Sequence, residues 1–146
     1  MIKIKRNLIQ NPILFLDHDG CMILRDSDGD LNDFFNKNCV KILNSIIEKT
    51  NCDIVVSSDW RLHYSLKQMN NLYKKFGVIK GPIDYTPNLW TSTSSIDDIE
   101  LIRSKEIELW LIRNLENNYV KWCAVDDMEL LLTNFVLCNQ DDGLTN

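Results

Sequence analysis

Two pairs of aspartates stand at the ends of apolar segments in this sequence. The apolar run Ile13–Leu16 leads directly into Asp17 and Asp19, and a second apolar segment ends in the adjacent Asp126 and Asp127. If the two segments are neighbouring strands, these carboxylates converge, and like charges so close cannot all stay ionised without compensation. Mg²⁺ supplies that compensation and prefers oxygen ligands. The aspartates therefore predict a Mg²⁺ site.

Two serines and two basic residues also lie at the ends of predicted elements. Ser57 and Ser58 end a third apolar run, and Ser57 is preferred as a donor to an anionic oxygen because it directly follows that run. Arg103 and Lys105 lie at the start of a helical stretch, on different faces because they are two positions apart. We expect only one of them to reach a phosphate, and the sequence leaves open which. Such a set suits phosphoryl transfer through an aspartyl-phosphate.

The elements that must position these groups follow from an alternation of short apolar runs with amphipathic stretches. This alternation is typical of a parallel sheet covered by helices on both faces. We expect strands at 13–16, 54–56, 83–85, 120–125 and 135–137, helices at 39–49, 65–76 and 102–115, and a weaker helical turn at 128–132. Trp90 and Trp110 are expected to pack in a loop or in the core. Since open α/β sheets bind ligands at the carboxyl ends of their strands, the site is predicted there.

In this order the groups resemble the four motifs of the haloacid dehalogenase (HAD) superfamily. The resemblance extends from Ile13 to at least Asp127 and rests on DxDG after an apolar strand, a hydroxyl-ended strand, a base at a helix start and a DD-ended strand. It implies an α/β, HAD-like (Rossmannoid) three-layer fold with a five-stranded parallel sheet of order 5-4-1-2-3. The segments SSDWR, RSKEIELWL, VDD and DDGLT look like the small HAD domains of nucleic-acid repair proteins.

The resemblance implies a catalytic role for five residues. Asp17 would be the nucleophile that becomes the aspartyl-phosphate. Asp19 would protonate the leaving oxygen and then serve as base for the hydrolytic water. Ser57 would hold the transferring phosphoryl oxygens, and Lys105 or Arg103 would neutralise the charge on nucleophile and phosphate.

The resemblance also implies the metal ligands. Asp17, the backbone carbonyl of Asp19, Asp126 and Asp127 would hold Mg²⁺, which neutralises charge and orients the phosphate. One position departs from the pattern, because Cys21 stands where the family commonly has Thr or Val. A small buried thiol fits this position, so we expect little effect.

Five residues in or beside these motifs have less specific chemistry. Gly20 permits a tight backbone path after the first strand, and we count it with Ser58 and Arg61 as candidates for substrate binding. Trp60 and Arg61 could stack on a base and grip a phosphate, or pack in the core beside a structural ion pair. His18 is expected to pack or hydrogen-bond and not to bind the metal.

Length and composition set limits on the class of protein. The chain has 146 residues, 45% of them apolar, and a formal net charge of −5, which suits a single domain over residues 1–146 with a small flap at about 21–36. The five cysteines include no CxxC pair, and neither an export signal nor a membrane span is evident, so we expect a cytoplasmic protein with reduced thiols. The acidic balance leaves no basic field to hold a long polyanion.

Chain length also bears on the substrate. The gaps after the first and third strands are too short for a cap domain, so the site is expected to be open. An open site suits a phosphorylated macromolecular end, and the preferred interpretation is a Mg²⁺-dependent phosphatase acting on phosphate monoesters at nucleic-acid termini. Two alternatives stay open: a phosphatase of nucleotides or other small phosphometabolites, and a non-catalytic HAD-like binding module.

Overall fold

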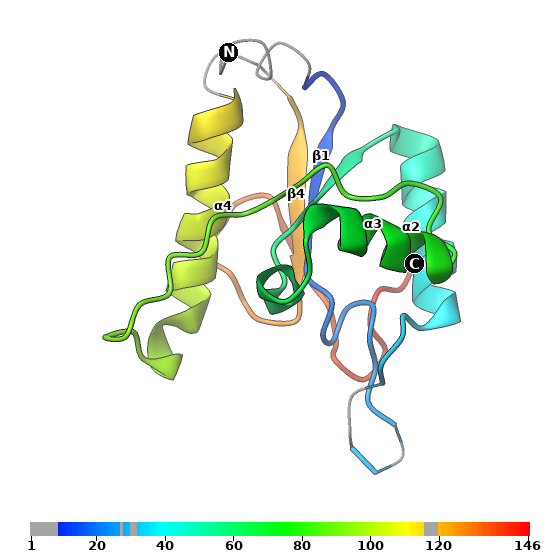
Figure 1. Ribbon diagram of the computed structural model, residues 1–146, viewed down its shortest axis with the longest axis horizontal. Helices are drawn as coiled ribbons and strands as arrows, with labels where there is room; N and C mark the ends of the chain where they lie inside the picture. Colours follow the sequence, from blue (N-terminus) through cyan, green and yellow to red (C-terminus); the bar gives the residue numbers. More distant parts are fainter. Residues whose placement is uncertain (1–8, 27, 30–31, 116–119) are drawn as a thin grey trace.

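Five parallel strands form the centre of the protein. The computed structural model describes residues 9–26, 28–29, 32–115 and 120–146 (Figure 1). The strands are β1 (Ile13–Leu16), β2 (Asp53–Val56), β3 (Asp84–Tyr85), β4 (Trp122–Asp126) and β5 (Phe135–Leu137), in the order β3-β2-β1-β4-β5. This is the predicted order 5-4-1-2-3 read from the other edge, and it confirms the predicted fold class.

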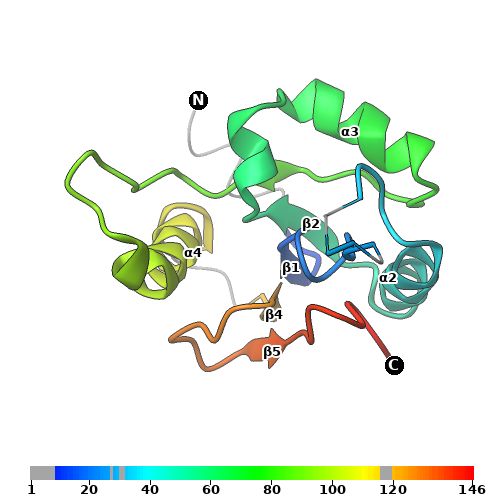
Figure 2. The ribbon, with the colours of Figure 1, turned by 90° about the horizontal axis from the view of Figure 1, so that it is seen from below.

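In the described residues, three α-helices and two short 3₁₀ helices accompany the sheet. They are α2 (Lys37–Thr50), α3 (Leu66–Lys75), α4 (Ile99–Leu115), η1 (Asp59–Leu62) and η2 (Ile96–Asp98). Figure 2 shows α4 on one face of the sheet and α2 with α3 on the other, which gives the three layers. No helix in the described part of the chain is long and apolar enough to cross a membrane.

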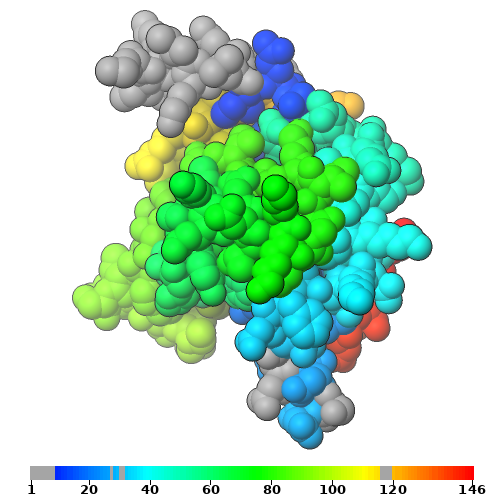
Figure 3. Space-filling view, turned by 45° about the vertical axis from the view of Figure 1, so that its right-hand side comes forward, coloured from blue at the N-terminus to red at the C-terminus, as the bar shows by residue number. Residues whose placement is uncertain are grey.

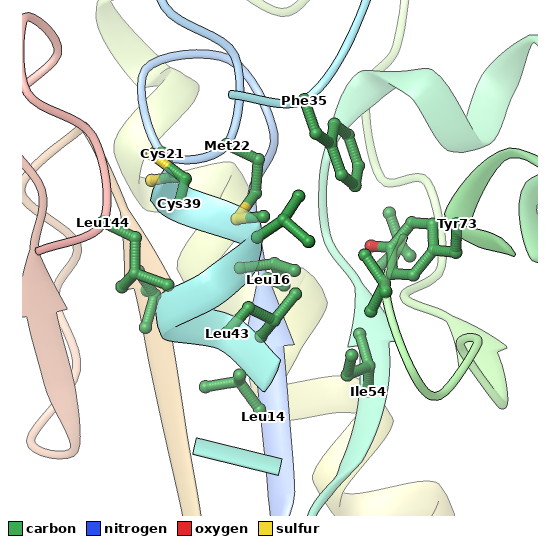
Figure 4. Packing of buried hydrophobic residues seen from close by; sticks show 14 of the residues in the cluster. Leu14, Leu16, Cys21, Met22, Phe35, Cys39, Leu43, Ile54, Tyr73 and Leu144 are labelled. Carbon is green, nitrogen blue, oxygen red and sulfur yellow. The ribbon is translucent and has the colours of Figure 1, made fainter. Parts of the chain in front are cut away.

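The residues of β1 supply both layers of the core, because successive side chains of a strand point to opposite faces. Leu14 and Leu16 pack with Tyr73 of α3 and with residues of α2 (Figure 4). Phe15 points to the other face and meets Trp110 of α4 edge-on, with ring centroids 5.4 Å apart. Burial on both faces explains why this strand reads as a continuous apolar run.

The helices begin and end at residues with clear capping chemistry. The Asn36 side chain accepts hydrogen bonds from two backbone amides at the start of α2, and Asn51 ends that helix in the left-handed conformation. Ser65 and Gln68 form a reciprocal capping box at the start of α3. Gly77, with φ of 88°, follows the end of α3, as the sequence predicts.

Two segments differ from the sequence prediction by more than two residues. Helix α4 begins at Ile99 and not at residue 102, because Ser95 caps η2 and starts the helical path one turn earlier. Residues 128–132 form no helix. Their backbone amides bond to side chains instead, Met128 N to Asp126 Oδ1 at 3.0 Å and Leu131 N to Ser104 Oγ at 2.9 Å.

The connections after β1 and β3 contain no cap domain in their described residues. The predicted flap at about 21–36 includes residues 27, 30 and 31, which lie outside the described part, as does the N-terminal segment 1–8. The two ends of the flap are tied together, since Asn36 N donates to Met22 O at 2.7 Å. In Figure 3 the described residues of this segment lie at the bottom of the molecule, below the face covered by α3 and the residues after it.

Candidate active site

The two aspartate pairs meet at the carboxyl ends of β1 and β4. Leu16 pairs with Val125 in the parallel register, so the next residues, Asp17 and Asp126, lie side by side. Oxygen atoms of Asp17, Asp126 and Asp127 all lie within 4.8 Å of one another. Asp17 and Asp126 are buried and Asp127 is half-buried. The register of two adjacent strands therefore creates the cluster that the sequence predicts.

Burial and mutual repulsion make this cluster electrostatically strained. Burial, followed by the charge of Asp126, raises the pKa of Asp17 well above its usual range, although Arg103 opposes the shift. Burial also raises the pKa of Asp126 against the opposing charge of Arg103. Three converging oxygen donors with excess negative charge match the ligand preference of Mg²⁺. The residues present therefore fit this ion.

Gly20 is essential to the shape of the cluster. It adopts φ of +79°, and a Cβ added at this position would overlap the carboxylate of Asp127. The turn that contains it is tight, since the carbonyl oxygen of His18 accepts hydrogen bonds from three consecutive amides, those of Cys21, Met22 and Ile23. The absence of a side chain at Gly20 therefore lets Asp127 approach Asp17, which is a positioning effect within the site.

The structure distinguishes between the two basic candidates. Arg103 is buried, and its Nη1 lies 3.0 Å from Asp126 Oδ2 and 3.3 Å from Asp17 Oδ1. Its Nη2 lies 3.4 Å from Oδ1 of the exposed Asp59. Lys105 is exposed on α4, two positions further along. The geometry thus brings Arg103, and not Lys105, to the carboxylates.

The two serines after β2 have different surroundings. Ser57 follows the residue of β2 that pairs with Leu16, so it lies across from Asp17 at the same edge of the sheet. Its Oγ is buried and has no hydrogen-bond partner among the described residues. Ser58 Oγ accepts a hydrogen bond from Trp60 N at 3.3 Å and caps η1. An unpaired buried hydroxyl beside Asp17 is therefore contributed by Ser57.

Asp19 has a hydrogen-bond donor that the sequence does not reveal. Trp60 Nε1 donates to Asp19 Oδ1 over 3.3 Å. Burial raises the pKa of Asp19, and this hydrogen bond acts against the rise. The two residues are 41 positions apart, and neither has a sequence feature that indicates the contact. The bond favours the orientation of the Asp19 carboxylate in which Oδ1 faces Trp60.

Arg61 lies in a structural brace and not beside the carboxylate cluster. Its side chain is 2% exposed, and its Nη2 lies 2.8 Å from Glu106 Oε2. The guanidinium also donates to backbone carbonyls of Ser57, Thr86 and two other residues. The sequence suggests a substrate-binding role for Arg61. The contacts do not support that role, because the N–H donors of Arg61 bond to protein atoms. The structural ion pair considered as the alternative is present.

His18 packs beneath the site. Its Nε2 lies 2.6 Å from the hydroxyl of Tyr73, and its ring contacts those of Phe35 and Trp60. Burial, with a smaller contribution from the charge of Arg103, lowers the pKa of His18 to about 3. A neutral imidazole held among aromatic rings is consistent with the packing role that the sequence predicts.

Comparison with known protein families identifies the family to which the chain belongs. The chain matches the family described as "HAD domain in Swiss Army Knife RNA repair proteins" over residues 13–146. Curated proteins give no significant match, and solved structures give none either. Because the match covers nearly the whole chain, this protein belongs to that family of HAD domains, which comprises HAD-type phosphoesterases or related modules.

Proposed function

We propose that this protein is a Mg²⁺-dependent phosphatase that hydrolyses phosphate monoesters at RNA ends through an aspartyl-phosphate. The observation that carries the proposal is the position of Asp17, which is buried beside the unpaired Ser57 hydroxyl and 3.3 Å from Arg103. A nucleophile, an oxyanion donor and a fixed cation are what phosphoryl transfer to a carboxylate needs.

The proposed reaction has two steps, and residues of this chain make the bonds and transfer the protons in both. An oxygen of Asp17 attacks phosphorus, and the bond from phosphorus to the ester oxygen breaks while Asp19 donates its proton to that leaving oxygen. Asp19 then accepts a proton from water, whose oxygen attacks phosphorus, releases inorganic phosphate and regenerates the Asp17 carboxylate. Arg103 and Ser57 stabilise the phosphoryl oxygens in both steps.

The metal's ligands in this proposal come from the strand ends. Asp17, Asp126, Asp127 and the backbone carbonyl of Asp19 would hold Mg²⁺. When bound, the ion neutralises negative charge and orients the phosphate.

Two observations support RNA ends as the substrate class. The matching family is described from RNA repair proteins, and the described connections after β1 and β3 hold no cap domain that would close over a small substrate. Recognition of one terminus requires few phosphate contacts, so the net charge of −5 is compatible with this class.

The test compares wild type with Asp17→Asn and Asp19→Asn. Substrates are p-nitrophenyl phosphate, mononucleotides, and oligoribonucleotides phosphorylated at the 3′ or the 5′ end, each with Mg²⁺ and with EDTA. We expect Mg²⁺-dependent turnover that both substitutions reduce by at least about 100-fold. Asp141→Asn, at an exposed position outside the cluster, is the matched control and should retain activity.

The mechanism, the substrate class and the activity can each be contradicted by a different result. Turnover in EDTA, or full activity of Asp17→Asn, contradicts the mechanism. Preference for mononucleotides over oligoribonucleotides contradicts RNA ends and favours the small-substrate alternative. Failure to hydrolyse any phosphate monoester favours the non-catalytic binding module.

A further inference from the structure

A pocket adjoins the candidate active site and shares residues with it. The pocket has a volume of about 320 Å³ and lies along α4. Arg103 and Asp59 form part of its wall, and the same Arg103 contacts Asp17 and Asp126. Only the side chain of Arg103 would therefore separate a group bound there from Asp17 and Asp126. We call this hollow the side pocket.

The side pocket is lined mainly by large apolar side chains from separate elements. Leu62 comes from η1, Trp90 from the segment after β3, Ile96 from η2 and Ile102 from α4. Figure 2 shows how the segment between β3 and α4 swings away from the sheet and returns to the start of α4. Leu62 is 50%, Trp90 43% and Ile96 71% exposed, although the sequence predicts that Trp90 packs in a loop or the core. Clustered exposed apolar groups around a hollow are typical of a binding site.

One wall of the side pocket is held by polar contacts to Glu106. Oε2 of Glu106, another lining residue, accepts hydrogen bonds from Arg61 Nη2 at 2.8 Å and from the backbone amide of Leu89 at 2.9 Å. The backbone amide of Trp90 donates to Asn88 Oδ1 at 3.0 Å. The two bonds to Glu106 join α4 to η1 and to the segment that carries Trp90, and the bond to Asn88 lies within that segment. Glu106 therefore fixes the position of the Leu89 backbone, next to Trp90, relative to α4.

Charge and size restrict what the side pocket can take. Arg103 is the one cation among the described lining residues, and its guanidinium is paired with carboxylates. Asp59 and Glu106 add negative charge to the wall, so a second phosphate is disfavoured. A volume near 320 Å³ is at the low end for ligand pockets. The fitting group is small, uncharged and largely apolar, and an indole beside it suits a flat aromatic ring.

We propose that the side pocket binds the base of the nucleotide whose phosphate is hydrolysed, with Trp90 as its stacking surface. This inference rests on the proposed function and deepens it by naming the part of the substrate that determines specificity. The same base could belong to a free nucleotide or to the terminal residue of an RNA, and the experiment distinguishes these sources.

The kinetic test uses the full chain with Mg²⁺ and pairs of substrates that differ only in the base. One pair is adenosine 5′-monophosphate and ribose 5-phosphate. The other is an oligoribonucleotide phosphorylated at the preferred end and terminated by adenosine or by an abasic residue. We expect Trp90→Ala to reduce the ratio of kcat/KM with base to kcat/KM without base at least about fivefold, which is the lower limit for loss of a stacked base. Trp90→Phe should retain most of the ratio.

A matched pair of isoleucines serves as control. Ile96 lines the side pocket, whereas Ile112 is 62% exposed further along α4 and is not among the lining residues. Ile96→Ala should reduce the ratio, and Ile112→Ala should leave it unchanged. An unchanged ratio in both Trp90→Ala and Ile96→Ala, with turnover intact, overturns the side-pocket proposal while the phosphatase proposal stands.

A binding measurement separates the pocket from catalysis. In ¹⁵N-labelled Asp17→Asn protein, adenosine 5′-monophosphate should shift the indole N–H resonance of Trp90, identified by its loss in Trp90→Phe, and ribose 5-phosphate should not. The absence of any shift overturns the side-pocket proposal. A shift in a protein that hydrolyses no phosphate monoester supports the pocket and rejects the phosphatase. Faster turnover of the oligoribonucleotide than of the free nucleotide identifies an RNA end as the source of the base.

Discussion

The hydrogen bond from Trp60 to Asp19 is the residue-scale contact with the most direct catalytic consequence. Asp19 must deliver its proton to the leaving oxygen, and a carboxylate that rotates freely does so less often. Trp60 Nε1, 3.3 Å from Asp19 Oδ1, restricts that rotation. The Trp60 ring also lies against that of Tyr64, with centroids 5.8 Å apart. The donor atom and the ring can therefore be tested separately.

Trp60→Phe removes the N–H donor and retains an aromatic ring. We expect kcat for ribose 5-phosphate, whose alkoxide leaving group needs a proton, to fall about fivefold, as loss of a hydrogen bond worth about 1 kcal/mol predicts. The effect on p-nitrophenyl phosphate should be smaller, because nitrophenolate leaves without protonation. Steady-state kinetics with both substrates would measure the two changes in kcat. Equal losses on the two would indicate a merely structural role, and Tyr64→Phe is the control.

At the scale of elements, the tight turn after β1 brings two strand ends together. Gly20 and Gly29 both have positive φ, 79° and 84°, but only the first faces another side chain. A Cβ at Gly20 would meet Asp127, whereas a Cβ at Gly29 meets nothing within 4 Å. Both glycines therefore need positive φ, but only Gly20 lies where a side chain would collide with Asp127.

Gly20→Ala and Gly29→Ala form a matched pair. Both should lower the free energy of unfolding by about 1 kcal/mol or more, because alanine is strained at positive φ. Only Gly20→Ala should also weaken Mg²⁺ binding, since its methyl group displaces Asp127. Isothermal titration calorimetry with Mg²⁺ measures this difference. Equal affinity in the two variants would contradict the positioning effect assigned to Gly20.

The brace of Arg61 and Glu106 connects η1, the segment after β3 and α4. Arg61→Met leaves the Glu106 carboxylate without its cation, and a broken buried pair costs about 3–5 kcal/mol. Urea denaturation should show this loss, whereas Arg113→Met, at an exposed position near the end of α4, should change stability by less than about 0.5 kcal/mol. Unaltered stability combined with a raised KM would restore the substrate-binding role that the sequence suggests for Arg61.

At the scale of the whole molecule, the aspartate cluster couples stability to metal binding. The carboxylates of Asp126 and Asp127 both raise the pKa of the buried Asp17, and Arg103 opposes this rise. Without a divalent cation, the repulsion among the three carboxylates opposes folding. An ion that binds the folded state stabilises it by about 2.7 kcal/mol at a hundredfold excess over Kd. The fold is therefore expected to be least stable when no divalent cation is present.

Thermal unfolding with and without Mg²⁺ tests this coupling. Saturating Mg²⁺ should raise the Tm of the wild type, and EDTA should reverse the increase. Asp127→Asn removes one source of repulsion, so without metal its Tm should equal or exceed that of the wild type, while its response to Mg²⁺ should be reduced. A full Mg²⁺ response in Asp127→Asn would show that this residue is not a ligand.

Local sequence patterns are sufficient to predict the sheet and the position of the candidate site along the chain. Apolar runs that end in polar residues are local features, and the parallel order of β1 and β4 is enough to bring Asp17 and Asp126 together. The start of α4 is predicted less accurately, because the helical path begins with η2, whose cap Ser95 lies in a loop of many serines and threonines.

Which polar side chains meet depends on the tertiary structure. Arg103 and not Lys105 reaches the carboxylates because of how α4 is rotated against the sheet. The Trp60–Asp19 bond and the Arg61–Glu106 brace join residues 41 and 45 positions apart, and the side pocket arises only where η1, η2 and α4 come together. Such contacts depend on packing angles and side-chain reach, which no local pattern of residues encodes.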